Sequence, residues 1–247
     1  MKPKDQALDV WGEFACFTRP ELKVERFSYP VPTPSAVRGI YDAIYCKPKE
    51  FRWQVTSIEI LAPPAYIALR RNEVKDKVPE KVDQWMRGVS EPEPIWADGT
   101  PAELGTDMKG RTQRQTMALR DVRYRLHAEV RPWRGFDDRL AGMEEQFRRR
   151  AAHGKCIYQP YLGCREFPAY FELVEIGTPP PQVEPFDLDI GLMLYDVFDL
   201  SEPGLPAMSE ADISISLFRA GVRAGVLGVP DYASGDVIKV PKGDGHA

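Results

Sequence analysis

The segment from Asp121 to Val130 restricts the fold more than any other part of the chain, because its side chains alternate between two types. The apolar members are Val122, Tyr124, Leu126, Ala128 and Val130. The polar members are Asp121, Arg123, Arg125, His127 and Glu129. A period of two indicates a strand with one face on a core and the other in solvent. We therefore expect a solvent face that carries two guanidinium groups beside an imidazole.

This expected face suits the holding or the cutting of RNA. Arginine binds phosphate in a planar fork, and a histidine exchanges protons near neutral pH. The net charge of -4 argues against a nucleic-acid partner, but the charge is uneven. Residues 109–150 contain 12 Lys and Arg against 6 Asp and Glu, whereas 166–247 contain 4 against 14. The asymmetry indicates one basic surface for phosphates, although ordinary solvated faces explain it equally well.

Local patterns predict an ordered series of elements along the chain. They are a strand over 8–17, a helix that Thr33 or Ser35 caps and Pro48 ends, a strand over 51–61, a polar insertion around 72–107 with one short helix, the strand described above, and a helix over 137–152. Further strands are expected over 168–175, 185–198, 212–218 and 237–240. Proline and glycine separate these later strands.

The order of the elements predicts an α+β fold. The first part, residues 1–165 with the insertion around 72–107, fits a ferredoxin-like or RNA-recognition-like domain. Residues 166–247 are expected to form a smaller antiparallel β-rich domain.

Several other classes of protein lack support in the sequence. No apolar run approaches the roughly 18 residues of a membrane span, and the first residues have no apolar signal core, so we expect a cytoplasmic protein without a membrane partner. The four cysteines form no CxxC pair and only three histidines exist, which disfavours a zinc site. Phosphate-binding, dinucleotide and nucleophile-elbow motifs are absent. We predict no metal and no cofactor.

Tyr45 and His127 are the candidate catalytic residues. RNA is cleaved without metal when its own 2′-hydroxyl attacks the adjacent phosphate, helped by proton transfer and by cations. Tyr45, at a helix end beside Lys47, could contact the phosphate or, with its pKa lowered by cations, activate the 2′-hydroxyl. His127 could serve either proton role. The alternatives are a half-buried amphipathic ring and an ordinary surface histidine.

Three segments, FACFTRPELKVERFSYPVPTPSAVRGIYDAIYCKP, RTQRQTMALRDVRYRLHAEV and YLGCREFPAYF, together resemble the CRISPR-associated Cas-five family. The resemblance, over roughly residues 8–171, is to the catalytic variant of subtype I-C systems. It implies a metal-independent endoribonuclease that cuts CRISPR precursor RNA within each repeat and leaves a 2′,3′-cyclic phosphate and a 5′-hydroxyl. It also implies that the protein stays on the 5′ handle of the crRNA, beside the other subunits of the type I-C effector complex.

The resemblance assigns roles to particular positions. Tyr45 in AIYCKP matches the family's catalytic tyrosine, and the family's lysine and histidine correspond to the region around His127, where Leu126 precedes the histidine in place of a lysine. The residues expected to bind RNA are Arg38, Lys47, Lys109, Arg111, Arg114, Arg123, Arg125, Tyr161 and Arg165. A noncatalytic subunit that binds the crRNA handle, a metal-dependent nuclease and weak DNA binding stay open as alternatives.

Overall fold

The computed structural model describes residues 2–22, 24–74, 81–92, 111–175, 177–179, 186–204 and 214–239. The chain divides into two compact units, of which the first comprises Met1–Ile67 with Met117–Ala247 and the second comprises Ala68–Thr116. The elements, in chain order, are β1 (Gln6–Ala15), β2 (Arg26–Phe27), α1 (Pro34–Ile44), β3 (Phe51–Ile60), β4 (Ala65–Val74), α2 (Val82–Met86), β5 (Arg111–Pro132), the 3-10 helix η1 (Asp137–Arg139), α4 (Leu140–Ala152), β6 (Tyr170–Val174), β7 (Leu188–Asp196), β8 (Ser216–Arg223), β9 (Val226–Gly228) and β10 (Val237–Lys239).

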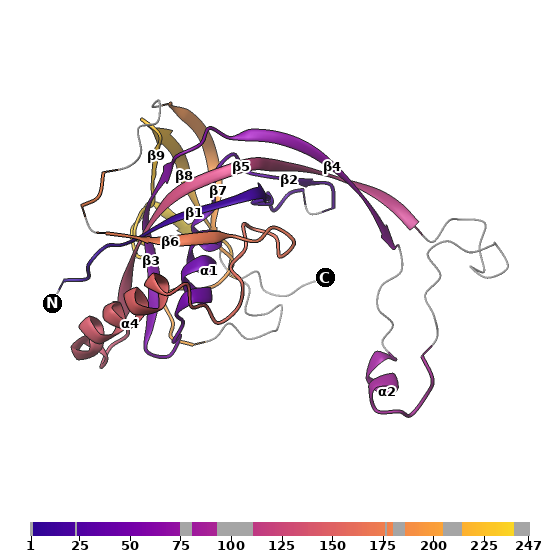
Figure 1. Cartoon of the computed structure of the whole chain (residues 1–247), viewed down its shortest axis with the longest axis horizontal. Coiled ribbons are helices and arrows are strands. Elements are labelled where there is room, and N and C mark those ends of the chain that lie inside the picture. The colour runs from indigo at the N-terminus through magenta and orange to yellow at the C-terminus, as the bar shows by residue number, and fades with distance from the viewer. Residues whose placement is uncertain are drawn as a thin grey trace. The chain divides into compact units, whose positions relative to one another are not determined.

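An antiparallel sheet dominates this mixed α and β fold (Figure 1). Its strand order is β10-β8-β9-β3-β5-β1-β6. Strand β5 lies between β1 and β3, with Leu126 opposite Leu8 on one side and Ile58 on the other. Strand β9 pairs with β3, so the C-terminal strands belong to the same sheet as the N-terminal ones. The domain boundary at residue 165 therefore stays a prediction.

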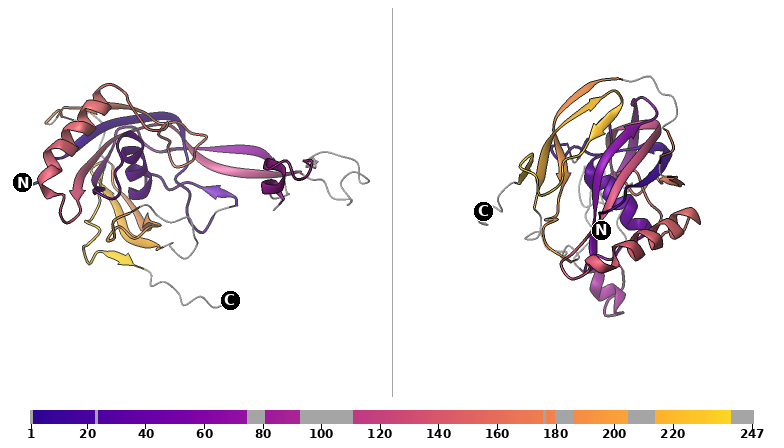
Figure 2. Two further views of the ribbon diagram at one scale, coloured as in Figure 1. Left: turned by 90° about the horizontal axis from the view of Figure 1, so that it is seen from below. Right: turned by 90° about the vertical axis from the view of Figure 1, so that its left-hand side faces the viewer.

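The alternation in β5 produces the core that the sequence predicts. The apolar members of the segment are each between 0% and 4% exposed. Helix α1 packs on this face through Tyr41, whose hydroxyl donates to the carbonyl oxygens of Gln6 at 2.7 Å and Leu126 at 2.8 Å. Trp53 of β3 completes the contact, with its ring 4.9 Å from that of Tyr41 and 4.7 Å from that of Phe147 on α4. The C-terminal strands lie on the side away from α4 (Figure 2).

Helix α1 begins and ends where its sequence dictates. The Thr33 hydroxyl accepts a hydrogen bond from the Ala36 amide at 3.2 Å, and Pro34 occupies the first turn, where it costs no hydrogen bond. The apolar positions Val37, Ile40, Tyr41 and Ile44 are buried, as predicted. Tyr45 then turns to an extended conformation, with φ -151° and ψ 115°. This change of direction sends the chain toward β3.

The second unit contains the end of β4, helix α2 and the start of β5. Strands β4 and β5 pair with each other. Arg114 of β5 lies 3.9 Å from Glu73 of β4, measured from Nε to Oε2. The short helix that the sequence placed in the insertion is confirmed by α2.

Candidate functional site

Tyr45 lies at the C-terminal end of α1 with its ring half-buried. The ring packs on Phe51 of β3, with 5.3 Å between the ring centres. The Tyr45 amide donates to the Tyr41 carbonyl at 2.9 Å, and the Tyr45 carbonyl accepts from Trp53 Nε1 at 2.9 Å. The backbone on both sides of the ring is thus fixed by the core.

Charged side chains lie near this tyrosine, and Arg139 is linked to them through Glu50. Lys47 Nζ lies 3.0 Å from Glu50 Oε1, and Arg139 Nη1, from η1, lies 3.8 Å from Glu50 Oε2. Arg150 of α4 donates from Nε to the Ile44 carbonyl, one residue before Tyr45. The Lys47 side chain is 46% exposed and that of Arg139 is 60% exposed, so both cations remain accessible. We call Tyr45, Lys47, Glu50, Arg139 and Arg150 the Tyr45 cluster.

The pKa of Tyr45 is raised from its ordinary value, whereas one of the two roles expected from the sequence, activation of the 2′-hydroxyl, needs a lowered pKa. Burial of the phenol is the largest cause and Glu50 adds to it, whereas Lys47 and Arg150 oppose it. A hydroxyl with a raised pKa is neutral at neutral pH. It can donate a hydrogen bond and orient a substrate, but it does not act as a phenolate base.

Arg139 and Arg150 are members of the cluster that sequence reasoning missed. Arg150 lies in the last turn of α4, where its attraction to the helix dipole is a sufficient structural explanation, and Arg139 lies in η1, before the helix begins. Only the packing of α4 beside α1 and β3 brings them to Tyr45, and no local sequence signal reports that contact. The signal that was present was the excess of arginine in residues 109–150.

His127 lies on the other face of β5, between two carboxylates. Its Nδ1 is 2.6 Å from Asp5 Oδ2, and its Nε2 is 3.2 Å from Glu59 Oε1. Burial alone would lower its pKa, but the hydrogen bonds and negative charges of Asp5 and Glu59 outweigh burial and raise it. In the protonated form that these carboxylates favour, both ring nitrogens would donate and neither would accept a proton.

The structure does not bring Tyr45 and His127 together. The core face of the sheet carries Leu126 and Trp53, and α1 packs against that face. His127 follows Leu126 in a strand, and successive side chains of a strand point to opposite faces. The sheet therefore separates the two rings, and a single site built on both residues is incompatible with this fold.

The prediction of two solvent-exposed guanidinium groups on β5 is wrong for Arg125. Its side chain is only 4% exposed. Asp9 stands directly opposite on β1 and accepts from Arg125 Nε at 2.7 Å and from Nη2 at 3.1 Å, while the Thr178 carbonyl accepts from Nη1 at 3.0 Å. Because a buried guanidinium needs a partner, the neighbouring strand supplies the carboxylate. Arg125 holds β5 to β1.

Arg123 is the accessible arginine of this face. Its side chain is 52% exposed, and its Nη2 lies 3.9 Å from Asp9 Oδ2. It borders a hollow of about 550 Å³, together with Trp11, Asp121 and Glu172. Of the two arginines predicted on this strand, Arg123 keeps the exposure that binding a phosphate requires.

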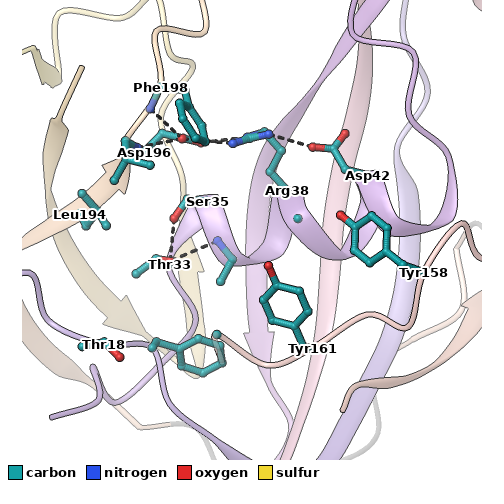
Figure 3. Close-up of a pocket in the computed structure, with 15 residues that line it drawn as sticks. Thr18, Thr33, Ser35, Arg38, Asp42, Tyr158, Tyr161, Leu194, Asp196 and Phe198 are labelled. Atoms are coloured by element: carbon teal, nitrogen blue, oxygen red, sulfur yellow. Dashed lines mark hydrogen bonds and ion pairs between the residues drawn. The ribbon is translucent and has the colours of Figure 1, made fainter. Parts of the chain in front are cut away.

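A second hollow, of about 380 Å³, brings together two of the predicted RNA-binding residues, Arg38 and Tyr161 (Figure 3). Arg38 projects from α1, and the rings of Tyr158 and Tyr161 form the wall beside it. Gly163 allows this wall to form, because its φ is +83° and a Cβ there would overlap the Cys16 carbonyl. The pair of rings gives the hollow the surface on which an unpaired base can stack.

Arg38 is held inside this hollow by two carboxylates. Its Nε and Nη2 donate to Asp196 at 2.8 and 3.1 Å, and its Nη1 donates to Asp42 at 2.8 Å (Figure 3). Asp196 ends β7, so the arginine joins α1 to the C-terminal strands. Burial works against the charge of Arg38, yet the two aspartates raise its pKa. Three of its donors are therefore already engaged.

The other predicted RNA-binding residues have different surroundings. Arg165 is exposed in the loop after Gly163, and Lys47 belongs to the Tyr45 cluster. Arg111 is exposed and Arg114 half-buried on the part of β5 that belongs to the second unit. Lys109 lies outside the described residues.

Neither a metal-binding cluster nor a membrane-spanning helix is found among the described residues. In those parts of the chain no group of three or more His, Cys, Asp or Glu side chains could hold a metal ion. No helix that the structure describes is long and apolar enough to cross a membrane.

Comparison with known proteins identifies the class as CRISPR-associated. Residues 7–230 match the model of the family described as CRISPR-associated protein (Cas_Cas5), and the chain belongs to this family. The family resemblance of the sequence is thereby confirmed.

Two relatives carry the name CRISPR pre-crRNA endoribonuclease Cas5d. One, from Mannheimia succiniciproducens, is 38% identical over 93% of this chain and 96% of its own length. The other, from Thermus thermophilus, is 37% identical over 96% of both chains.

Solved structures share the fold at lower identity. A protein described as "CRISPR-associated Protein" matches with a TM-score of 0.61 and 20% identity, over 95% of this chain and 96% of that one. A functionally uncharacterized protein from Streptococcus mutans matches with a TM-score of 0.60 and 17% identity, over 95% of this chain and 97% of that one.

Proposed function

We propose that this chain is an endoribonuclease that cleaves CRISPR precursor RNA within the repeat. The observation that carries the proposal is its identity of 37% to 38%, over nearly the full length, to two proteins named as pre-crRNA endoribonucleases. We further propose that the protein stays on the 5′ handle of the mature crRNA as a subunit of the type I-C interference complex. RNA cleavage and retention of one product then take place on the same subunit.

The Tyr45 cluster supports a mechanism without a metal ion. The 2′-hydroxyl attacks the adjacent phosphorus and gives its proton to water, the bond from phosphorus to the 5′-oxygen breaks, and that oxygen takes up a proton from water. The products are a 2′,3′-cyclic phosphate and a 5′-hydroxyl. The neutral phenol of Tyr45 orients the reacting linkage by a hydrogen bond, and the accessible cations Lys47 and Arg139 stabilise the negative charge that develops on the phosphoryl oxygens.

We propose a structural role for His127, apart from the Tyr45 cluster. The sequence assigned it a proton-transfer role, but its two carboxylate partners favour a structural one, in which an imidazolium on β5 joins Asp5, just before β1, to Glu59 of β3. The two roles predict different effects of replacing His127 on cleavage and on stability.

The predicted RNA-binding residues divide by accessibility. We propose that Lys47, Arg123 and Arg165 contact phosphates and that Tyr161 stacks on an unpaired base. Arg38 and Arg125 maintain the shape of the RNA-binding surface and do not themselves contact phosphates, because carboxylates already bind them. Lys109, Arg111 and Arg114 stay as predicted contacts for RNA, and weak DNA binding would use the same cations.

We propose that the first part of the chain is ferredoxin-like. The elements β1, α1, β3, β5, α4 and β6 follow the β-α-β-β-α-β order of that fold, and their strands stand in the order β3-β5-β1-β6. The boundary at residue 165 and the smaller β-rich domain of 166–247 belong to the same proposal. Because the proposed substrate is an RNA transcript, we place the protein in the cytoplasm.

The decisive experiment incubates the purified protein with repeat RNA in EDTA. We expect one discrete cut, and no cut when the nucleotide that supplies the 2′-hydroxyl is replaced by its 2′-deoxy form, although that RNA still binds. Tight binding without cleavage would instead identify a noncatalytic handle-binding subunit. Cleavage that needs magnesium or manganese would identify a metal-dependent nuclease.

A further inference from the structure

Two cysteines meet beside the hollow that Arg38 and Tyr161 line. Cys16 follows the end of β1, and Cys164 lies in the loop that carries Tyr161. Although they stand 148 positions apart in the chain, the Cys164 Sγ lies 3.5 Å from the Cys16 carbonyl oxygen. The Thr18 hydroxyl lies between the two sulfur atoms, 3.5 Å from that of Cys16 and 3.9 Å from that of Cys164. Proton transfer in the proposed cleavage reaction uses neither thiol.

The backbone holds these two positions close together. The Cys16 amide donates to the Leu162 carbonyl at 3.0 Å. The Phe167 amide donates to the Cys164 carbonyl at 2.9 Å and closes the loop. Gly163 approaches so near that a Cβ there would overlap the Cys16 carbonyl. The fold itself thus holds the backbone of Cys16 against the loop that carries Cys164.

The surroundings of Cys164 favour its ionised form. Arg26 Nη1 lies 3.6 Å from the Cys164 sulfur, and the Thr18 hydroxyl lies 3.5 Å from one sulfur and 3.9 Å from the other. The pKa of Cys164 is lowered to about 7, first by the hydrogen bond from Cys16 and also by Arg26 and Thr18, against burial and the charge of Glu166. A thiolate is the form that attacks oxidants.

The two cysteines differ in access to solvent, as a pair for stepwise oxidation requires. Cys164 is partly exposed, whereas Cys16 is fully buried. A small oxidant therefore reaches Cys164 first, and Cys16 is the thiol that reacts in the second step. The other two cysteines, Cys46 and Cys156, are also partly exposed. They provide internal controls of similar accessibility.

We infer that Cys164 is an oxidation site for peroxides and that it forms a reversible disulfide with Cys16. In the first step the Cys164 thiolate attacks one oxygen of hydrogen peroxide, the O–O bond breaks, and sulfenic acid and hydroxide form. In the second step the Cys16 sulfur attacks the sulfenic sulfur, the disulfide forms, and water leaves with the Cys16 proton. Sulfur is oxidised and peroxide is reduced. Two external thiols restore the pair.

The inference goes beyond the proposed cleavage of RNA and does not depend on it. Phe17 and Thr18, next to Cys16, and Gly163, next to Cys164, line the hollow with Tyr161. The disulfide would fix the wall of the hollow to the end of β1. Oxidation then changes the mobility of a surface that we propose to contact RNA.

The test treats the reduced full chain with hydrogen peroxide, blocks the remaining thiols with N-ethylmaleimide and maps the peptides by mass spectrometry. We expect a Cys16–Cys164 linked peptide, two hydrogens lighter than the sum of its parts and absent after dithiothreitol. Cys46 and Cys156 should still be alkylated. We also expect the oxidised protein to unfold several degrees higher than the reduced protein.

Two variants sharpen this test. The variant Cys164→Ser should lose both the linked peptide and the shift of the unfolding temperature. The variant Cys16→Ala should leave Cys164 as a sulfenic acid that dimedone traps. Should Cys16→Ala fail to fold, the wild-type peptide map still decides. The inference is overturned if Cys164 reacts no faster than Cys156, or if its oxidation ends in sulfonic acid or in links between molecules without a bond to Cys16.

Discussion

The two faces of the central sheet hold cations in opposite ways. On the polar face of β5, Arg125 is bound by Asp9 of β1, and His127 is bound by Glu59 of β3 and by Asp5, just before β1. At the end of α1, Lys47 and Arg139 share one glutamate and remain about half exposed or more. A substrate phosphate can approach the second group without displacing a buried ion pair. For this reason we propose that the chemistry takes place at the Tyr45 cluster and that the ion pairs on β5 are structural.

The largest effect should come from removing the two accessible cations of the Tyr45 cluster together. Replacing Lys47 and Arg139 by alanine withdraws the charges that stabilise the transition state, so we expect single-turnover cleavage to fall by about 100-fold or more. The matched control is Arg134→Ala, an exposed arginine beside η1. If the control lost as much activity as the double variant, general basic charge rather than this cluster would be responsible.

The next effect concerns stability on the other face. Asp9→Ala leaves the Arg125 guanidinium buried without its carboxylate, which should lower the free energy of unfolding by about 3 kcal/mol. Arg123→Ala, which removes an exposed guanidinium near the same aspartate, should change it by less than about 0.5 kcal/mol. Urea denaturation followed by circular dichroism measures both. Equal losses for the two variants would contradict the assignment of Arg125 as the structural arginine.

The imidazolium network predicts a pH dependence of stability. Because the pKa of His127 is raised in the folded protein, its stabilising contribution is fully present below the pKa of the unfolded chain, about 6.5. The contribution is lost as the pH rises through the folded value. The difference in unfolding free energy between wild type and His127→Gln should therefore be larger at pH 6 than at pH 9. A difference that grows with pH would reverse the sign and refute the network.

The smallest effect should be on RNA affinity. We expect Arg123→Ala to weaken binding of repeat RNA severalfold and to reduce the slope of log affinity against log salt by about one phosphate contact. Unfolding should stay unchanged. A fluorescence-anisotropy titration at three salt concentrations measures the slope. An unchanged slope would remove Arg123 from the RNA surface.

The sequence predicts the local elements well because their signals are local. The alternation of β5, the Thr33 cap and the apolar stripe of α1 each depend on neighbouring residues, and the structure confirms them. The prediction that both arginines of β5 are exposed was wrong for Arg125. A period of two shows which face of the strand a side chain lies on, but not which side chains of the neighbouring strand contact it. Asp9 and Arg125 meet only through strand register.

The candidate site was harder to predict for the same reason. Tyr45 could be predicted from the sequence because it lies in a segment that resembles the Cas-five family. Arg139 and Arg150 come from η1 and α4, and they reach the end of α1 only when the helices pack. Contacts between segments that are distant in the sequence cannot be predicted from the composition or periodicity of one segment.

One measurement tests the central claim most directly: the single-turnover cleavage rate of repeat RNA in EDTA by Tyr45→Phe and His127→Gln, assayed beside wild type at a pH where all three are folded. We predict that Tyr45→Phe loses at least about 100-fold in rate, while RNA binding changes less than about twofold and His127→Gln stays within about threefold of wild type. The reverse result, with His127→Gln inactive and Tyr45→Phe active, would place the chemistry on the polar face of β5 and contradict this account.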